Sequence, residues 1–155
     1  MIPYSKQSIT ERDIDEVVRV LKSDFLTQGP SIPRFERALE KKFEVKYAVA
    51  CSSGTAALHL AYASLGVGPG SIGVVPSITF SATANSFLYL GADVRFCDVD
   101  RSTGLICCDS LESILQSIQP DSKLKSVVIS PVSFAGATAS LDRVYDIGHR
   151  YGIKW

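Results

Sequence analysis

The sequence predicts an α/β fold in which a mostly parallel sheet carries helices on both faces. Short apolar runs rich in Val and Ile alternate along the chain with segments of helical periodicity, and Gly-rich turns separate them. The composition, 46% hydrophobic and 21% charged over 155 residues, is that of about one folded domain. Strands that alternate with helices form right-handed βαβ units, which bury a parallel sheet on both sides.

Two amphipathic helices are predicted ahead of the first strand. Thr10 can cap the first helix, which runs to about Lys22 with one apolar stripe. Residues 23–30 form a loop, because they contain a Gly-Pro pair. The second helix begins near Ser31, and three apolar residues recur every four positions on one of its faces: Phe35, Leu39 and Phe43.

Units of strand and helix follow. The predicted strands cover residues 47–51, 72–75, 93–99 and 124–130, and a further strand begins at Ile153. The predicted helices cover residues 55–65, 80–90, 109–118 and 141–151. Ligands of such sheets bind at the carboxyl ends of the strands, so the segments directly after residues 51 and 75 are candidate binding loops.

Charge and the length of apolar runs argue against several classes of partner. The 16 basic and 16 acidic residues give a net charge of zero, and no Lys/Arg block forms a nucleic-acid footprint. No apolar run reaches the roughly 18 residues of a membrane helix, and the N-terminus lacks the apolar core of a signal peptide. We therefore expect a cytoplasmic protein with neither a nucleic-acid nor a membrane partner.

Four cysteines occur, at positions 51, 97, 107 and 108. Their spacing fits neither a zinc site nor a disulfide framework, so we expect free thiols. His59 and His149 lack a third ligand, and we predict no metal site.

The stretch Ser52-Ser53-Gly54-Thr55 lies where a predicted strand ends and a helix begins. Such a junction points backbone N–H groups and hydroxyls at one spot, and it can hold a phosphate. Ser and Thr also favour an ordinary helix N-cap, so position alone leaves both interpretations open. The stretch is neither a Walker loop, which ends in Gly-Lys-Ser/Thr, nor a dinucleotide fingerprint, which needs three glycines at fixed spacing.

Phe80 lies in a second polar segment, residues 76–85, after the next strand. A lone aromatic residue is more often part of a core. The Ser, Thr and Asn residues around this one raise the chance that its ring faces a ligand, on which a flat cofactor ring could stack.

Several of these segments resemble one known family. Their order and spacing are similar to those of the DegT/DnrJ/StrS sugar aminotransferases, which are pyridoxal 5′-phosphate (PLP) enzymes of the aspartate aminotransferase fold, type I. The resemblance implies that residues 1–155 form the N-terminal segment and the first part of an incomplete PLP-binding large domain. The matching motifs are FLTQGP at 25–30, SGTAAL at 53–58, PSITFSATAN at 76–85, GA at 91–92 and DVD at 98–100.

The resemblance also implies roles for individual residues. The loop of Gly54, Thr55 and Ala56 holds the PLP phosphate, and Phe80 stacks on the pyridine ring. Five residues lie near the nucleotide sugar: Tyr4, Asp24, Phe25, Leu26 and Thr27.

Residues 2–9 and 23–29 are most similar to one branch of the family. That branch aminates a UDP-4-keto-6-deoxy-N-acetylhexosamine on the way to pseudaminic acid. The implied reaction is amino transfer from glutamate, and the intact enzyme is expected to be a homodimer with shared active sites.

The chain departs from the family at three points and, more consequentially, at its end. Ser71-Ile72-Gly73 replaces the acidic turn that the family has after Gly-Pro-Gly. Ser133 and Ala137 stand where the family usually has His or Asp and Gln or Lys. The Schiff-base lysine and the Asp that pairs with the pyridine nitrogen would lie beyond Trp155, so we expect no catalytic residue in this chain and no transamination by it alone. The alternative is a non-catalytic α/β remnant that binds a phosphate, a nucleotide or a partner protein.

The first predicted strand, residues 47–51, would lack the neighbours it has in the family. Its backbone N–H and C=O groups would form an open edge. We therefore expect low stability, self-association or a changed strand order.

Overall fold

A computed structural model describes residues 6–118 and 125–153 of the chain. The chain divides into two compact units, Met1–Ala50 and Cys51–Trp155. None of the described helices is long and apolar enough to cross a membrane.

The first unit contains helices α1 (Glu11–Leu21) and α2 (Ser31–Phe43). The Thr10 backbone N–H donates to the Asp13 carboxylate at 2.8 Å, which fixes the start of α1 as the sequence predicts. Glu44 directly follows the last residue of α2, and its left-handed φ of 54° terminates the helix. The apolar stripes of both helices remain largely exposed, with Leu39 half-buried, and no side chain among residues 6–50 is buried.

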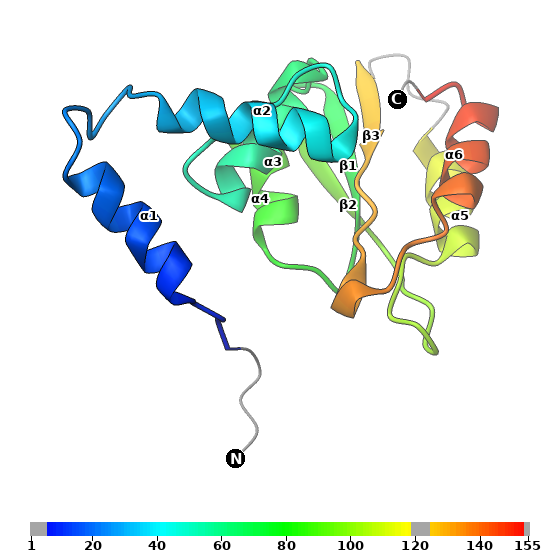
Figure 1. The fold of residues 1–155 in the computed structure, drawn as a ribbon. Coiled ribbons are helices and arrows are strands. Elements are labelled where there is room, and N and C mark those ends of the chain that lie inside the picture. The colour runs from blue at the N-terminus through cyan, green and yellow to red at the C-terminus, as the bar shows by residue number, and fades with distance from the viewer. Residues whose placement is uncertain (1–5, 119–124, 154–155) are drawn as a thin grey trace. The chain divides into compact units, whose positions relative to one another are not determined.

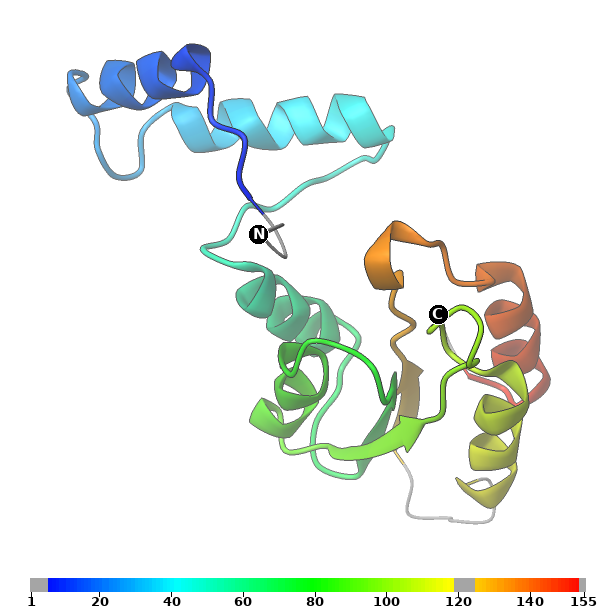
Figure 2. The same cartoon turned by 90° about the horizontal axis from the view of Figure 1, so that it is seen from below.

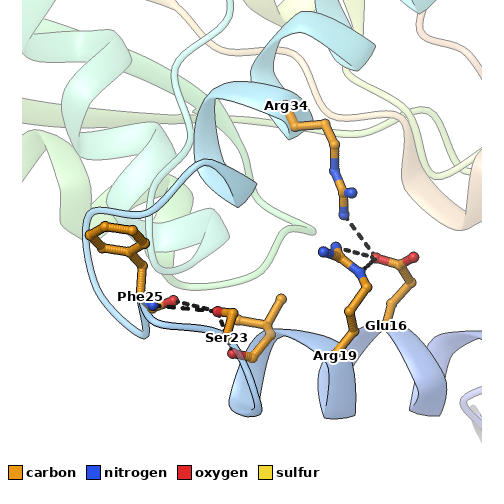
Figure 3. Close-up of polar contacts among 6 residues, drawn as sticks. Glu16, Arg19, Ser23, Phe25 and Arg34 are labelled. Atoms are coloured by element: carbon orange, nitrogen blue, oxygen red, sulfur yellow. Dashed lines mark hydrogen bonds and ion pairs between the residues drawn. The ribbon is translucent and has the colours of Figure 1, made fainter.

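An ion-pair bridge joins the two helices (Figure 3). The Glu16 carboxylate accepts hydrogen bonds from Arg19 Nη2 and Arg34 Nη2, each at 2.8 Å. At the tip of the hairpin, Ser23 Oγ donates to the Phe25 carbonyl at 3.1 Å. A Cβ built on Gly29 would lie 2.7 Å from Phe25 Cβ, so this tight tip requires glycine.

The prediction of a strand at residues 47–51 is wrong. This segment is irregular, and it is absent from the three-stranded sheet. Carboxylates of α2 occupy the N–H groups that would face a neighbouring strand, because Ala48 donates to Glu40 at 3.3 Å and Ala50 donates to Glu36 at 2.9 Å. The side chains that alternate with these two alanines, Tyr47 and Val49, are 73% and 77% exposed. Residues 47–51 therefore have a strand-like apolar sequence but form no strand, because a strand requires a neighbouring strand with which to pair.

The second unit contains a parallel sheet of order β2-β1-β3. Its strands are β1 (Ser71–Pro76), β2 (Asp93–Cys97) and β3 (Ser126–Ile129). Strand β1 lies in the centre, where its Val74 pairs with Arg95 of β2 and with Ile129 of β3.

Helices cover both faces of this sheet (Figures 1 and 2), which confirms the predicted fold class. Val75 of β1 packs with Tyr62 and Phe87, from α3 (Gly54–Ser64) and α4 (Ala82–Tyr89). Val74 packs into the opposite cluster, with residues of α5 (Cys108–Ile118) and α6 (Leu141–Arg150). A short 3-10 turn, η1 (Phe134–Gly136), lies between β3 and α6.

The other predicted elements agree with the observed helices and strands to within two residues at each described end. The predicted start of the 124–130 strand and most of the strand predicted from Ile153 lie outside the described residues.

Candidate functional site

The N-terminus of α3 contains free backbone donors. Ser53 precedes the helix in an extended conformation, and its Oγ accepts a hydrogen bond from the Ala56 N–H at 3.1 Å. Ser53 is therefore an ordinary N-cap as well as a neighbour of the predicted phosphate loop. Among the described residues, nothing accepts a hydrogen bond from the N–H groups of Gly54 and Thr55. These two N–H groups remain available to an anion at the positive end of the helix dipole.

Phe80 is held at the turn between β1 and α4. Its carbonyl accepts a hydrogen bond from the Thr83 N–H at 3.0 Å, and the hydroxyls of Thr79 and Thr83 are 2.8 Å apart. Its side chain is nevertheless 76% exposed. A fixed backbone with a free aromatic face fits the prediction of a ring that faces a ligand.

One hollow of about 590 Å³ joins these two features. Its lining contains none of the charged residue types, so attraction for an anion arises from the N-terminus of α3. The structure thus brings Gly54, Thr55 and Phe80 together, whereas Ala56 is absent from the lining. The residues that line the hollow are Gly54, Thr55, Ala57, Leu58, Ala61, Phe80 and Ala82.

The surroundings of Gly54 differ from those that the sequence predicts. Gly54 was predicted at the carboxyl end of a strand, but residues 47–51 are irregular. Only the Phe80 segment follows a strand of the sheet, namely β1. The hollow is formed instead by the packing of α3 against α4.

Tyr62 is a residue that sequence reasoning missed. It is 4% exposed, and its hydroxyl donates to Ser130 Oγ at 2.8 Å and lies 3.4 Å from the Thr83 carbonyl oxygen. Its ring stacks on Phe87, with the centroids 3.8 Å apart and an interplanar angle of 15°. Burial raises the pKa of Tyr62, and the hydrogen bond with Ser130 opposes this shift only in part. The group is therefore a neutral hydroxyl at pH 7.

The predicted sugar-binding residues belong to the first unit. Asp24, Phe25, Leu26 and Thr27 are all exposed at the tip of the α1–α2 hairpin. Tyr4 lies outside the described residues.

No group of His, Cys, Asp or Glu side chains that could hold a metal ion occurs in residues 6–118 and 125–153. His59 is half-buried, and its ring meets Tyr89 edge-on at a centroid distance of 5.9 Å. The ring therefore has a packing role in α3.

Comparison with known proteins gives consistent matches along the chain. Residues 7–155 match the profile of the DegT/DnrJ/EryC1/StrS aminotransferase family. A UDP-4-amino-4-deoxy-L-arabinose–oxoglutarate aminotransferase of Shewanella sediminis is 37% identical over 152 residues, which are 98% of this chain and 37% of that protein.

Two solved structures show the same fold. Spr1654 of Streptococcus pneumoniae in its PLP form has a TM-score of 0.81 and 34% identity, over 94% of this chain and 36% of that one. PseC of Helicobacter pylori, an aminotransferase involved in pseudaminic acid biosynthesis, has a TM-score of 0.82 and 27% identity, over 97% of this chain and 39% of that one. The chain thus spans a little more than a third of the length of these relatives.

Proposed function

Because this chain belongs to the DegT/DnrJ/EryC1/StrS aminotransferase family, we propose that its hollow holds PLP in an enzyme that aminates a nucleotide sugar. One observation carries the proposal. The free N–H groups of Gly54 and Thr55 and the exposed ring of Phe80 line the same hollow. A phosphate and a flat ring are the two chemical features that such a lining recognises.

The residues that line the hollow would contact different parts of the cofactor. Gly54 and Thr55 would bind the phosphate through their N–H groups. Ala56 would contribute indirectly, because its N–H donates to Ser53 Oγ, the N-cap of the helix. Phe80 would cover one face of the pyridine ring. PLP, when bound, supplies the electron sink for moving an amino group from a donor to a keto sugar.

We further propose a UDP-4-keto-6-deoxy-N-acetylhexosamine as the acceptor and glutamate as the donor. The likeness to PseC supports this acceptor. Tyr4 and the hairpin tip, Asp24 to Thr27, are the proposed sugar-binding residues. The intact protein is proposed to be a homodimer, which sedimentation of that protein would test.

A UDP-4-keto pentose is the second candidate acceptor. The 37% identical relative is named for a 4-amino-4-deoxy-L-arabinose nucleotide, which supports this alternative. Turnover of both keto sugars by the full-length protein, with glutamate in excess, distinguishes them. A higher kcat/KM for the pentose would overturn the hexosamine proposal.

The 155-residue polypeptide by itself is proposed to lack transaminase activity. None of its lysines lies in the context of the family's Schiff-base lysine. Transfer requires a lysine that holds the cofactor and then moves a proton, so loss of that group removes the chemical step. Borohydride treatment with PLP should fix no cofactor to one specific lysine. Specific labelling of a single lysine would contradict the proposal.

Titration with pyridoxine 5′-phosphate tests the cofactor site. This probe carries the ring and phosphate of PLP but no aldehyde, so it cannot react with surface lysines. We expect NMR shifts at the amides of Gly54 and Thr55. Phe80→Ala should weaken binding by roughly 2- to 10-fold through loss of stacking. Phe96→Ala, which removes an exposed ring of β2 outside the hollow, is the matched control. Shifts confined to other regions would contradict the proposed site.

A further inference from the structure

We infer that Tyr62 is a positioning residue of the proposed cofactor site, and this inference rests on the proposed function. Its hydroxyl ties α3 to α4 and to the end of β3. It thereby fixes the spacing between the N–H donors of Gly54 and Thr55 and the ring of Phe80.

Tyr62 acts from a distance. It lies eight residues after Gly54 on α3, which is about 12 Å along the helix axis. It is buried and absent from the lining of the hollow. Its effect on a ligand must therefore pass through the elements that it joins.

The path to Phe80 consists of one polar contact and one hydrogen bond. The Tyr62 hydroxyl lies 3.4 Å from the Thr83 carbonyl oxygen, and the Thr83 N–H donates to the Phe80 carbonyl at 3.0 Å. The turn that carries Phe80 is thus connected to α3 through a single residue of α4.

The path to the sheet is shorter. Tyr62 donates to Ser130 Oγ at 2.8 Å, and the Ser130 N–H donates to the Val74 carbonyl at 2.9 Å. A tyrosine hydroxyl has one hydrogen, so the 2.8 Å contact is the stronger of its two contacts. Helix α3 is thereby anchored to the carboxyl end of the strand layer.

The ring and the hydroxyl of Tyr62 have separable roles. The ring stacks on Phe87, and Tyr62→Phe keeps this contact while it removes only the hydroxyl. The variant leaves Ser130 Oγ without its partner and removes the contact with the Thr83 carbonyl, so α3 loses its polar restraints toward both the sheet and α4. Packing alone then holds the two halves of the hollow together.

Two probes separate positioning from general stability. Inorganic phosphate binds through the N-terminus of α3 alone. Pyridoxine 5′-phosphate also contacts Phe80, so its binding depends on the distance between that terminus and the Phe80 ring. In the 155-residue chain we expect Tyr62→Phe to lower the affinity for pyridoxine 5′-phosphate about fivefold. The affinity for inorganic phosphate should change less than twofold. Amide exchange at Thr83 and Asn85 should become faster in the ligand-free variant.

Control variants complete the experiment. Tyr89→Phe removes an exposed hydroxyl from α4 and should change neither affinity. Ser130→Ala removes the same Tyr62–Ser130 hydrogen bond but leaves the contact with Thr83, so it should weaken pyridoxine 5′-phosphate binding in the same direction. The double variant should lose less affinity than the sum of the two single losses, since both changes remove this shared hydrogen bond. Ser130→Ala also carries the test if Tyr62→Phe does not fold.

Three results would overturn the inference. Equal affinities of Tyr62→Phe and Tyr89→Phe for pyridoxine 5′-phosphate would leave the proposed function intact and remove the positioning role. A parallel loss of phosphate and pyridoxine 5′-phosphate would assign Tyr62 to general stability. Failure of the unchanged chain to bind either probe would overturn the proposed cofactor site and the inference together.

Discussion

At the scale of single residues, the thiols differ in exposure. Cys51 is exposed, whereas Cys97 is buried. Burial raises the pKa of the Cys97 thiol, so this group stays protonated and unreactive at pH 8. We predict that an aromatic disulfide reagent modifies Cys51 first and reaches Cys97 only on unfolding. Cys51→Ser should remove the fast phase. A fast phase that persists in Cys51→Ser would contradict the prediction that Cys51 reacts first.

The buried hydroxyl of Ser86 has no hydrogen-bond partner among the described residues. An unsatisfied buried hydroxyl destabilises the folded state, so Ser86→Ala should raise the free energy of unfolding by about 1 kcal/mol. Ser113→Ala, at an exposed site of α5, gives the same gain in helix propensity and removes only a solvent-exposed hydrogen bond to the Asp109 carbonyl. Equal shifts of the denaturation midpoint in both variants would show that burial of Ser86 contributes nothing.

At the scale of elements, β1 accommodates α4 through Gly73. A Cβ built on Gly73 would lie 2.5 Å from the Phe87 ring, which is fully buried. We predict that Gly73→Ala lowers the free energy of unfolding by about 1–3 kcal/mol through overpacking. Adding Phe87→Leu, which removes the clashing ring, should restore part of this loss. Chemical denaturation measures both changes, and full stability of Gly73→Ala would disprove the clash.

The α1–α2 hairpin has a pH-dependent bridge. Hydrogen bonds from Arg19, and then from Arg34, hold the pKa of Glu16 below its usual 4.5. A lowered folded-state pKa stabilises the fold above the usual value, and this stabilisation is lost as the pH falls through the folded-state pKa. We predict that residues of the hairpin lose helical NMR shifts below about pH 4.5. Glu16→Gln should weaken this pH dependence, whereas Glu11→Gln, on the same helix, should preserve it. Identical titrations of both variants would exclude the bridge as the cause.

The elements show what local sequence can predict. The β1 run and α4 were predicted within two residues, because a Gly-Pro-Gly turn and Gly91 delimit them. Residues 47–51 have equally strong strand character, yet pairing depends on a neighbour that no local pattern encodes. In the site, Gly54 and Phe80 were predicted from their flanking polar residues. Tyr62 was not, since its partners Thr83 and Ser130 lie 21 and 68 residues away.

At the scale of the whole molecule, the two units differ in how much apolar surface they bury. The second unit has two buried clusters, one on each face of its sheet. Residues 6–50 have no buried side chain, although their helices carry apolar stripes. About 45 residues without a core of their own cannot form an independently stable fold. Exposed apolar helices followed by an unpaired β-like segment are therefore the surface on which copies of this chain should meet.

We predict that the 155-residue chain self-associates as its concentration rises from about 1 to 100 μM. Val49 is 77% exposed in the unpaired segment, and a charged side chain there opposes strand pairing between copies. Val49→Lys should therefore shift the sedimentation profile toward monomer. Leu88→Lys adds the same charge at an exposed site of α4 and should change the sedimentation profile little. A chain that stays monomeric over this range and unfolds in one cooperative transition at high temperature would contradict the prediction, because its first unit would then be stable without a covering surface.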